Sequence, residues 1–287
     1  MSIGSKKIKI NTTKGHSISA TEFYSEKGNG ETILITSATG VLQKYYSKFA
    51  SFFARKGYVV YTFDYNGIGS SGGTIKQLKK NTSTLKEWGS IDQAAITLYA
   101  KQKNPNNNLT VITHSIGGQI VGFNGNYKMI DKLILVASQS GYWNLFSGTH
   151  KLKMFLFWCA ILPVSTKIYG YFPAKKIGLF ENLPKNMSYE WAKWGTKKNY
   201  FMHYYSETEY FFHKINIPTL SYSFPKDYYA PKAAVDWLTK QYGSTKIKRI
   251  HYTPAAADLS KLKHFGFFRA HFKDSLWKTT EKWIRTN

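Results

Sequence analysis

The chain has 287 residues, of which 43% are hydrophobic and 20% charged, so it can bury a packed core and disorder is not expected. Its length suits one large domain, or one domain with an insertion. Forty Lys and Arg residues stand against 16 Asp and Glu residues, which gives a net charge of +24. Because the basic residues are spread along the chain in pairs and triplets, we interpret this charge as a compositional bias. We expect no specific nucleic-acid partner and at most weak association with an anionic surface.

The single cysteine, Cys159, cannot form an internal disulfide bond, which favours a reducing compartment and predicts a cytoplasmic protein. Cys159 lies in the apolar run 154–164, where we expect a buried side chain. This run has about half of the roughly 20 residues that a membrane span needs, so it predicts no transmembrane helix. The basic N-terminus is not followed by an apolar region, so we expect no secretory signal.

Metal and cofactor motifs do not fit this sequence. The eight histidines form no His-Glu-x-x-His pair, and one cysteine cannot build a cysteine-rich zinc site. The glycine-rich stretches lack the Lys-Ser ending of a P-loop and the strand-linked dinucleotide pattern. We therefore expect neither a metal nor a cofactor.

Strands and helices alternate along most of the chain. Short β-branched and aromatic runs predict strands at 32–36, 58–63, 109–113, 131–138, 217–224 and 246–252. Apolar residues at helical spacing predict helices over 44–57, 85–102, 231–243 and 269–284, and a further helix that begins at residue 116. This alternation predicts an α/β fold with a mostly parallel sheet and helices on both faces.

One segment interrupts the alternation. Residues 141–214 are rich in aromatic residues and lysine and contain no clear strand. We interpret 141–214 as an inserted, mainly helical cap over a core formed by 1–140 and 215–287.

The stretch VITHSIGGQI, residues 111–120, places a serine between a strand-like run and a pair of glycines. A nucleophilic serine needs a defined position, which a sharp strand-to-helix turn provides, and small neighbours, because that turn is crowded. Gly117 meets this need after Ser115, whereas Thr113 occupies the position where a glycine is expected. The predicted strand before Ser115 and the helix after it favour a nucleophile over an ordinary turn residue.

Two later loops offer a carboxylate and a base in the chain order Ser-Asp-His that such a turn uses. Asp227 comes directly after a predicted strand, and His264 precedes the terminal helix. Asp258, in the loop before His264, is the rival carboxylate. His271 is the rival base, but it falls within the predicted terminal helix. We predict that Ser115, Asp227 and His264 form a catalytic triad.

Backbone amides must stabilise the negative charge that develops on the substrate oxygen. Ile116, directly after Ser115, offers an amide at a helix N-terminus. The second amide should follow the first central strand, where Gly40 and Val41 are the candidates. The sequence alone does not choose between them.

Five segments resemble the α/β-hydrolases of the serine-aminopeptidase-like and monoacylglycerol-lipase-like branch. They are ATGVLQKYY (38–46), FDYNGIGSSGG (63–73), THSIGGQ (113–119), SFPKDYYAP (223–231) and HFGFFR (264–269). Two more, YFPAKKIGLFENLP (171–184) and EWAKWG (190–195), resemble the cap of a group of bacterial predicted hydrolases. The resemblance implies an α/β-hydrolase fold with a cap, a hydrolytic reaction, and a structural role for the loop from Asp64 to Ser71.

We therefore predict a serine hydrolase that cleaves a carboxylic ester through an acyl-enzyme. Its expected partner is a small, apolar acyl ester, held in a pocket formed by Trp143, Phe146 and Trp158. An acyltransferase or a peptidase would use the same triad. A non-catalytic scaffold of the same fold that binds anionic partners is a further alternative.

Overall fold

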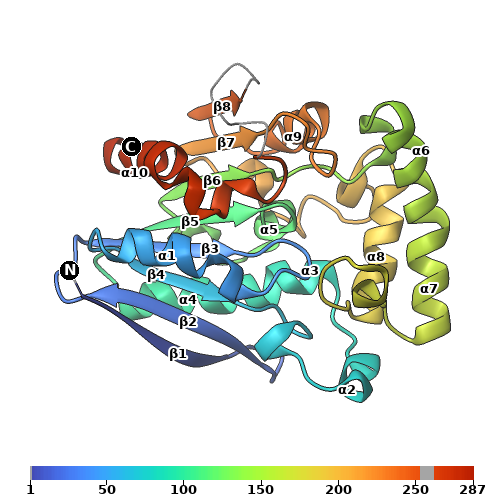
Figure 1. Ribbon diagram of the computed structural model, residues 1–287, viewed down its shortest axis with the longest axis horizontal. Helices are drawn as coiled ribbons and strands as arrows, with labels where there is room; N and C mark the ends of the chain where they lie inside the picture. Colours follow the sequence, from blue (N-terminus) through green and yellow to red (C-terminus); the bar gives the residue numbers. More distant parts are fainter. Residues whose placement is uncertain (1, 253–261) are drawn as a thin grey trace.

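The computed structural model describes residues 2–252 and 262–287. Its strands are β1 (Ile3–Asn11), β2 (Ser17–Ser25), β3 (Glu31–Thr36), β4 (Val59–Phe63), β5 (Asn108–His114), β6 (Lys132–Val136), β7 (Thr219–Ser223) and β8 (Ile247–His251). They form a sheet with the order β1-β2-β4-β3-β5-β6-β7-β8 (Figure 1). β2 pairs antiparallel with β1 and β4, and every neighbouring pair from β4 to β8 is parallel. The predicted α/β class with a mostly parallel sheet is confirmed.

Helices cover both faces of this sheet (Figure 1). The α-helices are α1 (Ser47–Ala54), α2 (Ile75–Lys80), α3 (Leu85–Glu87), α4 (Ala94–Lys103), α5 (Ile116–Ile120), α6 (Gly148–Leu156), α7 (Leu162–Tyr169), α8 (Lys185–Gly195), α9 (Lys232–Thr239) and α10 (Lys278–Thr286). Within the described residues, three stretches are π-helical, namely η3 (Trp88–Gln93), η7 (Phe157–Ile161) and η14 (Lys273–Trp277). Short 3₁₀ turns include η1 (Gln43–Tyr46), η8 (Ala174–Ile177), η12 (Gly266–Phe268) and η13 (Ala270–Phe272).

Alternate residues of the central strands supply two hydrophobic cores, one on each face of the sheet. On β5, Val111 belongs to the core that contains Trp88. The next residue, Ile112, belongs to the opposite core, with Phe49 of α1 and Trp277 of η14. Both faces of β5 are buried, so its sequence shows a run of mostly apolar residues and not an alternation of apolar and polar ones.

The six predicted strands correspond to β3 through β8 and are confirmed. The sequence analysis did not predict the hairpin of β1 and β2. β1 is an edge strand, and only Ile10 of its nine residues is fully buried, so it has little apolar signal. Lysines on an exposed edge are typical of a strand that must not pair with another chain.

A π turn changes the buried face of the helix predicted over 85–102. The π-helix η3 adds a residue to the turn, so the buried face passes from Trp88 to Ile96 and Ala100. Regular helical spacing places Ile91, Ala95 and Leu98 on that face, but all three are only partly buried. The helix prediction is confirmed, and its buried face is corrected at these residues.

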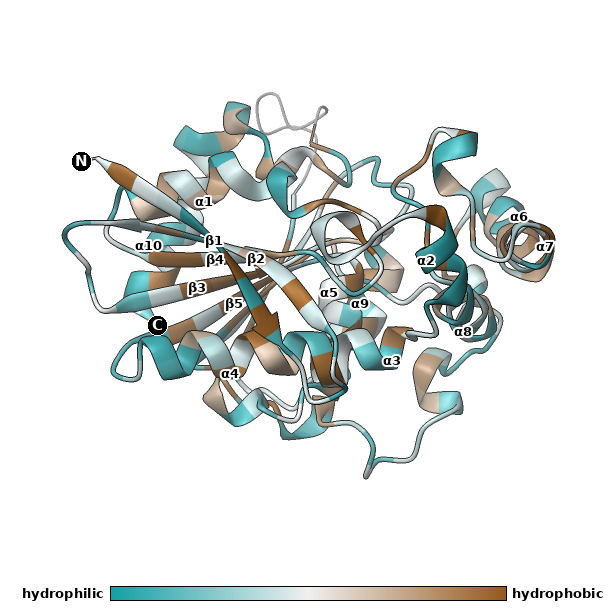
Figure 2. Ribbon diagram, turned by 90° about the horizontal axis from the view of Figure 1, so that it is seen from below, coloured by the Kyte–Doolittle hydropathy of each residue, from teal (hydrophilic) through white to brown (hydrophobic). Residues whose placement is uncertain are grey.

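The segment 141–214 contains α6, α7 and α8, which lie together to one side of the sheet (Figure 1). α8 lies between α7 and the sheet in both views (Figure 1, Figure 2). Outside the named strands, one isolated antiparallel bridge joins Phe172 to Leu183 in this segment.

α6, η7 and α7 form one helix, Gly148–Tyr169, of 22 residues. By length and composition alone this helix could cross a membrane. The run 154–164 is therefore part of a longer apolar helix than the sequence indicated, because the helix extends beyond that run at both ends. Cys159 is exposed on this helix, which corrects the expectation that its side chain is buried.

Candidate active site

Ser115 stands at the turn between β5 and α5, with φ 51° and ψ −114°. A non-glycine residue rarely adopts a positive φ, so its surroundings must hold this backbone. The Ser115 amide donates to the Val136 carbonyl at 3.0 Å, and α5 begins at the next residue. Gly117 is packed so closely that a Cβ there would lie 2.4 Å from Thr36 Oγ1. The turn is therefore as crowded as a nucleophile turn requires.

Thr113 fits beside the turn because a second glycine follows Ser115. Its Oγ1 is hydrogen bonded to Ser138 Oγ at 3.0 Å. A Cβ on Gly118 would lie 2.3 Å from Ser138 Oγ and 2.7 Å from Thr113 Oγ1. The Thr113 and Ser138 hydroxyls thus lie where a side chain at position 118 would otherwise be. Because residue 118 is a glycine, Thr113 can replace the glycine expected at position 113.

Asp227 and His264 are in direct contact. His264 Nδ1 lies 2.9 Å from Asp227 Oδ2 and 3.1 Å from Oδ1. The Asp227 side chain is fully buried, and its Oδ1 accepts hydrogen bonds from the amides of Tyr229 and Ala230 at 3.0 and 2.9 Å. Because a carboxylate can only accept, His264 carries its proton on Nδ1 and leaves Nε2 free to take one.

Ser115 and His264 line the same cavity. The Ser115 hydroxyl, however, donates to Gln139 Oε1 at 3.4 Å, which is long for such a bond. Gln139 is held in turn by its Nε2, which donates to the Tyr229 carbonyl at 3.1 Å. Across residues 2–252 and 262–287, no hydrogen bond joins Ser115 to His264. In unliganded enzymes such a bond is often long and tightens only around the substrate.

The loop after β3 narrows the choice of oxyanion donors. The Val41 amide donates to the Ala38 carbonyl at 3.0 Å. This amide is already hydrogen bonded, so the prediction of Val41 as an oxyanion donor is corrected. Gly40, with φ 63°, and Thr39 both line the cavity. The Ile116 amide is the first of α5 and therefore has no partner within the helix. The sequence analysis missed Thr39, since a backbone amide has no side-chain signal.

His114 connects the loop of His264 to the loop after β3 through hydrogen bonds. His114 Nε2 lies 3.0 Å from the His264 carbonyl, which can only accept, so Nε2 carries the proton. Its Nδ1 therefore accepts from the Tyr46 hydroxyl at 2.9 Å, and that hydroxyl accepts from the Ala38 amide at 2.9 Å. Burial, reinforced by the nearby His264, lowers the pKa of His114 well below its usual value. A neutral His114 thus ties the loop of His264 to the loop after β3.

The role of His114 was not predicted from the sequence. The available signal was a histidine in an otherwise apolar strand, directly before the serine. Its partner Tyr46 is also fully buried, and burial raises the pKa of this tyrosine well above its usual value.

The cavity that Ser115 borders has a volume of about 670 Å³. Of the predicted pocket residues, Phe146 and Trp158 line it. Trp143 is not among the described residues that line it, which corrects that prediction. Its ring packs on Phe155 at 5.1 Å, with Lys151 Nζ 5.3 Å from its centre.

Backbone strain is concentrated around the three predicted catalytic residues. In the described parts of the chain, five non-glycine residues have a positive φ. One is Ser115, and two others, Lys226 at 56° and Lys263 at 40°, directly precede Asp227 and His264. Such strain persists only where the surrounding structure holds it, and it clusters at functional sites.

The structure tests one of the two rival residues. Asp258 lies outside the described residues. His271 is exposed in η13 and is not one of the described residues that line the cavity.

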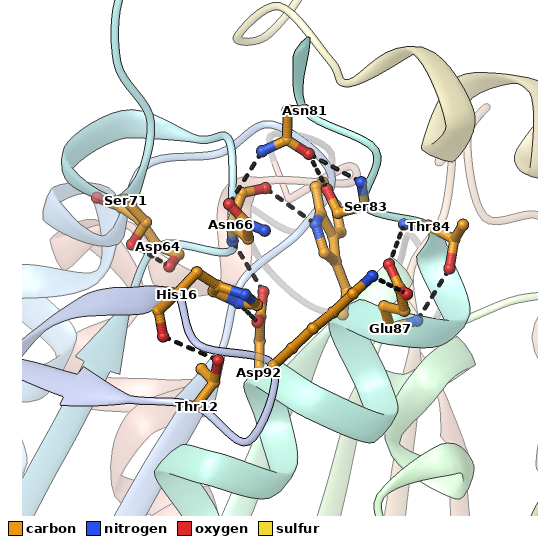
Figure 3. Close-up of polar contacts among 12 residues, drawn as sticks. Thr12, His16, Asp64, Asn66, Ser71, Asn81, Ser83, Thr84, Glu87 and Asp92 are labelled. Atoms are coloured by element: carbon orange, nitrogen blue, oxygen red, sulfur yellow. Dashed lines mark hydrogen bonds and ion pairs between the residues drawn. The ribbon is translucent and has the colours of Figure 1, made fainter. Parts of the chain in front are cut away.

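A second histidine–carboxylate pair lies outside the cavity (Figure 3). His16 Nε2 lies 2.7 Å from Asp92 Oδ1, and Asp92 Oδ2 accepts from the Asn66 amide at 2.8 Å. In the same loop, Ser71 Oγ donates to the Asp64 carbonyl at 2.6 Å. Burial raises the pKa of Asp92, and the bond from His16 opposes that rise. These contacts fasten the β1–β2 turn and the π turn η3 to the loop from Asp64 to Ser71, so that loop is structural.

The sheet order and the serine at the strand-to-helix turn after β5 define an α/β-hydrolase. The family described as serine aminopeptidase, S33, matches residues 31–186. The chain belongs to this family of hydrolases.

Solved structures of the same fold include esterases. The Pyrococcus furiosus esterase Pf2001 has a TM-score of 0.66 and 15% identity, over 99% of this chain and 91% of that one. An esterase from Exiguobacterium antarcticum has a TM-score of 0.59 and 13% identity, over 98% and 100%. Mouse alpha/beta hydrolase domain-containing protein 10 has a TM-score of 0.61 and 16% identity, over 98% and 99%. At such identities the likeness establishes the fold alone. Among curated proteins, no sequence matches this chain.

Proposed function

We propose that this chain is a serine hydrolase that cleaves a carboxylic ester through Ser115, His264 and Asp227. One observation carries the proposal: a serine held at positive φ borders the same cavity as a histidine whose Nδ1 is fixed by a buried carboxylate. The esterases among the structures of similar fold support ester chemistry as the reaction type.

In the acylation step, the Ser115 hydroxyl turns from Gln139 toward His264 and attacks the ester carbonyl carbon. His264 Nε2 takes the hydroxyl proton, and the Asp227 carboxylate stabilises the imidazolium that forms. The Ile116 amide and an amide of Thr39 or Gly40 bind the carbonyl oxygen as it becomes negative. The imidazolium then donates its proton to the alkoxide oxygen, the carbon–oxygen bond breaks, and the alcohol leaves.

In the deacylation step, water replaces the alcohol. His264 Nε2 takes a proton from the water as its oxygen attacks the acyl carbon. The carbon–Ser115 oxygen bond then breaks, the serine oxygen regains a proton from His264, and the acid leaves. The same residues therefore act in both halves of the reaction.

The cavity favours a small substrate with an apolar acyl group. Its volume of about 670 Å³ is in the range of small-molecule sites. Phe146, Phe157, Trp158, Phe180 and Trp191 contribute to its lining. All five lie within 141–214, so we propose that this segment is a cap that supplies the acyl pocket, over a core formed by 1–140 and 215–287.

The test compares turnover of short and medium p-nitrophenyl esters by wild type and two variants. Ser115→Ala should lose about 10⁶-fold in kcat, as expected when a serine nucleophile is removed. Ser188→Ala is the matched control, because Ser188 is equally buried but bonds the Pro184 carbonyl in α8. The control should keep wild-type turnover. Absence of turnover by the folded wild-type protein contradicts ester hydrolysis.

Acyl transfer and peptide hydrolysis would use the same triad. Product analysis in the presence of an alcohol separates hydrolysis from transfer, and a panel of aminoacyl amides tests peptidase activity. A scaffold that binds anionic partners predicts instead salt-sensitive nucleic-acid binding that survives Ser115→Ala.

A further inference from the structure

The helix Gly148–Tyr169 has an apolar face that is exposed. We name as the outer stripe its exposed Leu, Ile, Val and Phe side chains, Leu152, Phe155, Leu156, Ile161, Val164 and Ile168. Their exposed fractions run from 38% at Phe155 to 72% at Ile168. Cys159, exposed between them, continues the stripe. Scattered apolar residues on a surface are ordinary, but a continuous row along one helix marks an interaction surface.

The opposite face of the same helix is also apolar. Trp158, Leu162 and Thr166 are buried at intervals of four residues, and Met154 and Phe157 line the cavity. Only 17% of the most apolar part of the helix is buried. An apolar helix face is normally covered by a protein core or a membrane. This helix has a protein core on one side only.

The segment that carries the outer stripe is basic, although one of its lysines, Lys175, is paired with Glu181 at 2.6 Å. Residues 147–180 contain no Asp or Glu, and their lysines are Lys151, Lys153, Lys167, Lys175 and Lys176. Basic residues beside an apolar helix face are the composition of a helix that binds an anionic lipid surface. The net charge of +24 acts in the same direction over the longer range.

The cavity opens beside the outer stripe. Five residues that line it are themselves exposed: Lys153 and Ile161 on the helix, Gly178 and Leu179 in the loop after η8, and Tyr229 in the loop after β7. Ile161 is thus part of both the stripe and the rim of the cavity. In Figure 2, α6 and α7 lie at the outer edge of the molecule, remote from the sheet.

We propose that the outer stripe docks on an anionic lipid bilayer, with the helix parallel to the membrane and the mouth of the cavity at the interface. A helix of 22 residues is about 33 Å long, so the stripe offers several turns to the lipid. The helix does not span the bilayer, because Trp158, Leu162 and Thr166 are packed in the protein. A second copy of the chain fits the stripe less well, because it would bring two sets of lysines together.

The test is co-sedimentation of the full chain with vesicles. One set contains phosphatidylcholine and phosphatidylglycerol, and the other phosphatidylcholine alone. The double variant Val164→Asp, Ile168→Asp changes two exposed stripe residues that do not line the cavity. The matched control, Ser275→Asp with Thr279→Asp, adds the same charges at the same spacing to exposed positions of η14 and α10. In Figure 1, α10 lies on the opposite side of the molecule from α7.

We expect wild type to bind the anionic vesicles, to bind less in high salt, and to bind the neutral vesicles weakly. The stripe variant should lose at least about tenfold in affinity, and the control should stay within about twofold of wild type. Equal binding by wild type and the stripe variant overturns the proposal, as does absence of wild-type binding to anionic vesicles. A wild-type dimer in solution that the stripe variant abolishes also overturns it, in favour of a second copy.

Vesicle binding requires no catalysis, so this test is independent of the proposed ester hydrolysis. If a fluorophosphonate labels Ser115 but the protein binds no vesicles, the proposed hydrolase stands and the proposed docking surface is wrong. If the protein binds vesicles but takes no label, the docking surface stands and the proposed hydrolase is wrong. Circular dichroism and thermal unfolding of each variant verify that it is folded.

Discussion

The two halves of the candidate site are held in different ways. Asp227 and His264 are fixed to one another by side-chain bonds of 2.9 and 3.1 Å, and Asp227 is held further by two amides. Ser115 is positioned by its backbone, while its hydroxyl makes one bond of 3.4 Å to Gln139. The proposed acid and base are therefore fixed to one another, whereas the hydroxyl of the proposed nucleophile is held by one long bond. The following changes break or sharpen this contrast.

The largest loss is expected from Asp227→Asn. An asparagine amide in place of the carboxylate favours the wrong tautomer of His264, so Nε2 can no longer accept the serine proton. We expect kcat for p-nitrophenyl esters to fall about 10⁴-fold with little change in KM. Asp236→Asn is the control, because Asp236 bonds Arg249 and Lys232 and should leave kcat unchanged. Retention of wild-type turnover by Asp227→Asn would remove Asp227 from the triad.

A smaller loss is expected from His114→Phe, which keeps a buried ring but cuts the bonds to the Tyr46 hydroxyl and the His264 carbonyl. His114 is a positioning residue, and a misplacement of about 1 Å at the reacting groups can cost about 10²-fold. We expect kcat to fall by about 10- to 100-fold while KM changes little. An unchanged kcat means that the loop of His264 needs no anchor at its carbonyl.

His114 also makes a pH prediction. Its folded pKa is lowered, so below about pH 6.5 the unfolded chain binds a proton that the folded chain resists, and stability falls as the pH falls. Between pH 7.5 and pH 5.5, the free energy of unfolding of wild type should fall by about 1.4 kcal/mol more than that of His114→Phe. Urea unfolding at the two pH values measures this difference. All other titrating groups are common to both proteins. Equal losses would show that His114 titrates normally.

A test of the backbone's hold on Ser115 is Gly118→Ala. The new Cβ would lie 2.3 Å from Ser138 Oγ, so the turn must shift. We expect the free energy of unfolding to fall by about 1–3 kcal/mol, measured by urea denaturation. Gly125→Ala is the control, because a Cβ there meets nothing within 4 Å, and it should change stability by less than about 0.5 kcal/mol. If Gly118→Ala leaves the free energy of unfolding unchanged, the Thr113–Ser138 pair does not need the glycine.

The smallest effect is expected from Gln139→Met, which removes the acceptor of the Ser115 hydroxyl and the donor to the Tyr229 carbonyl at nearly constant volume. A neutral hydrogen bond contributes about 0.5–1.5 kcal/mol, and this one is long. The rate of reaction with a fluorophosphonate should therefore rise, by less than about tenfold. A large fall would show that Gln139 takes part in the reaction rather than holding the resting hydroxyl.

The sequence predicted the parallel part of the sheet well, because its strands depend on local patterns, and the same patterns named the three residues of the candidate site. β3 through β8 are apolar runs, and the order Ser115, Asp227, His264 follows from the turns after strands. The hairpin of β1 and β2 was not predicted because an edge strand buries few apolar side chains. The π turn η3 was not predicted because it changes the helical period without changing the composition.

Details of the site that depend on three-dimensional packing were out of reach of the sequence. Val41 was a reasonable oxyanion donor until its amide proved to bond Ala38. Thr113 counted against the turn until Ser138 and Gly118 were seen beside it. The exposure of Cys159 could not be expected either, because an apolar run predicts burial and not an unpartnered face.

The most direct measurement is fluorophosphonate labelling of the wild-type protein, followed by mass spectrometry of the labelled peptide. The geometry of the turn, the cavity and the Asp227–His264 pair predicts one adduct, on Ser115 Oγ, which is absent from Ser115→Ala and greatly slowed in Asp227→Asn. Folded wild-type protein that takes no label, or that takes it on another residue, would contradict the role of Ser115 as the nucleophile.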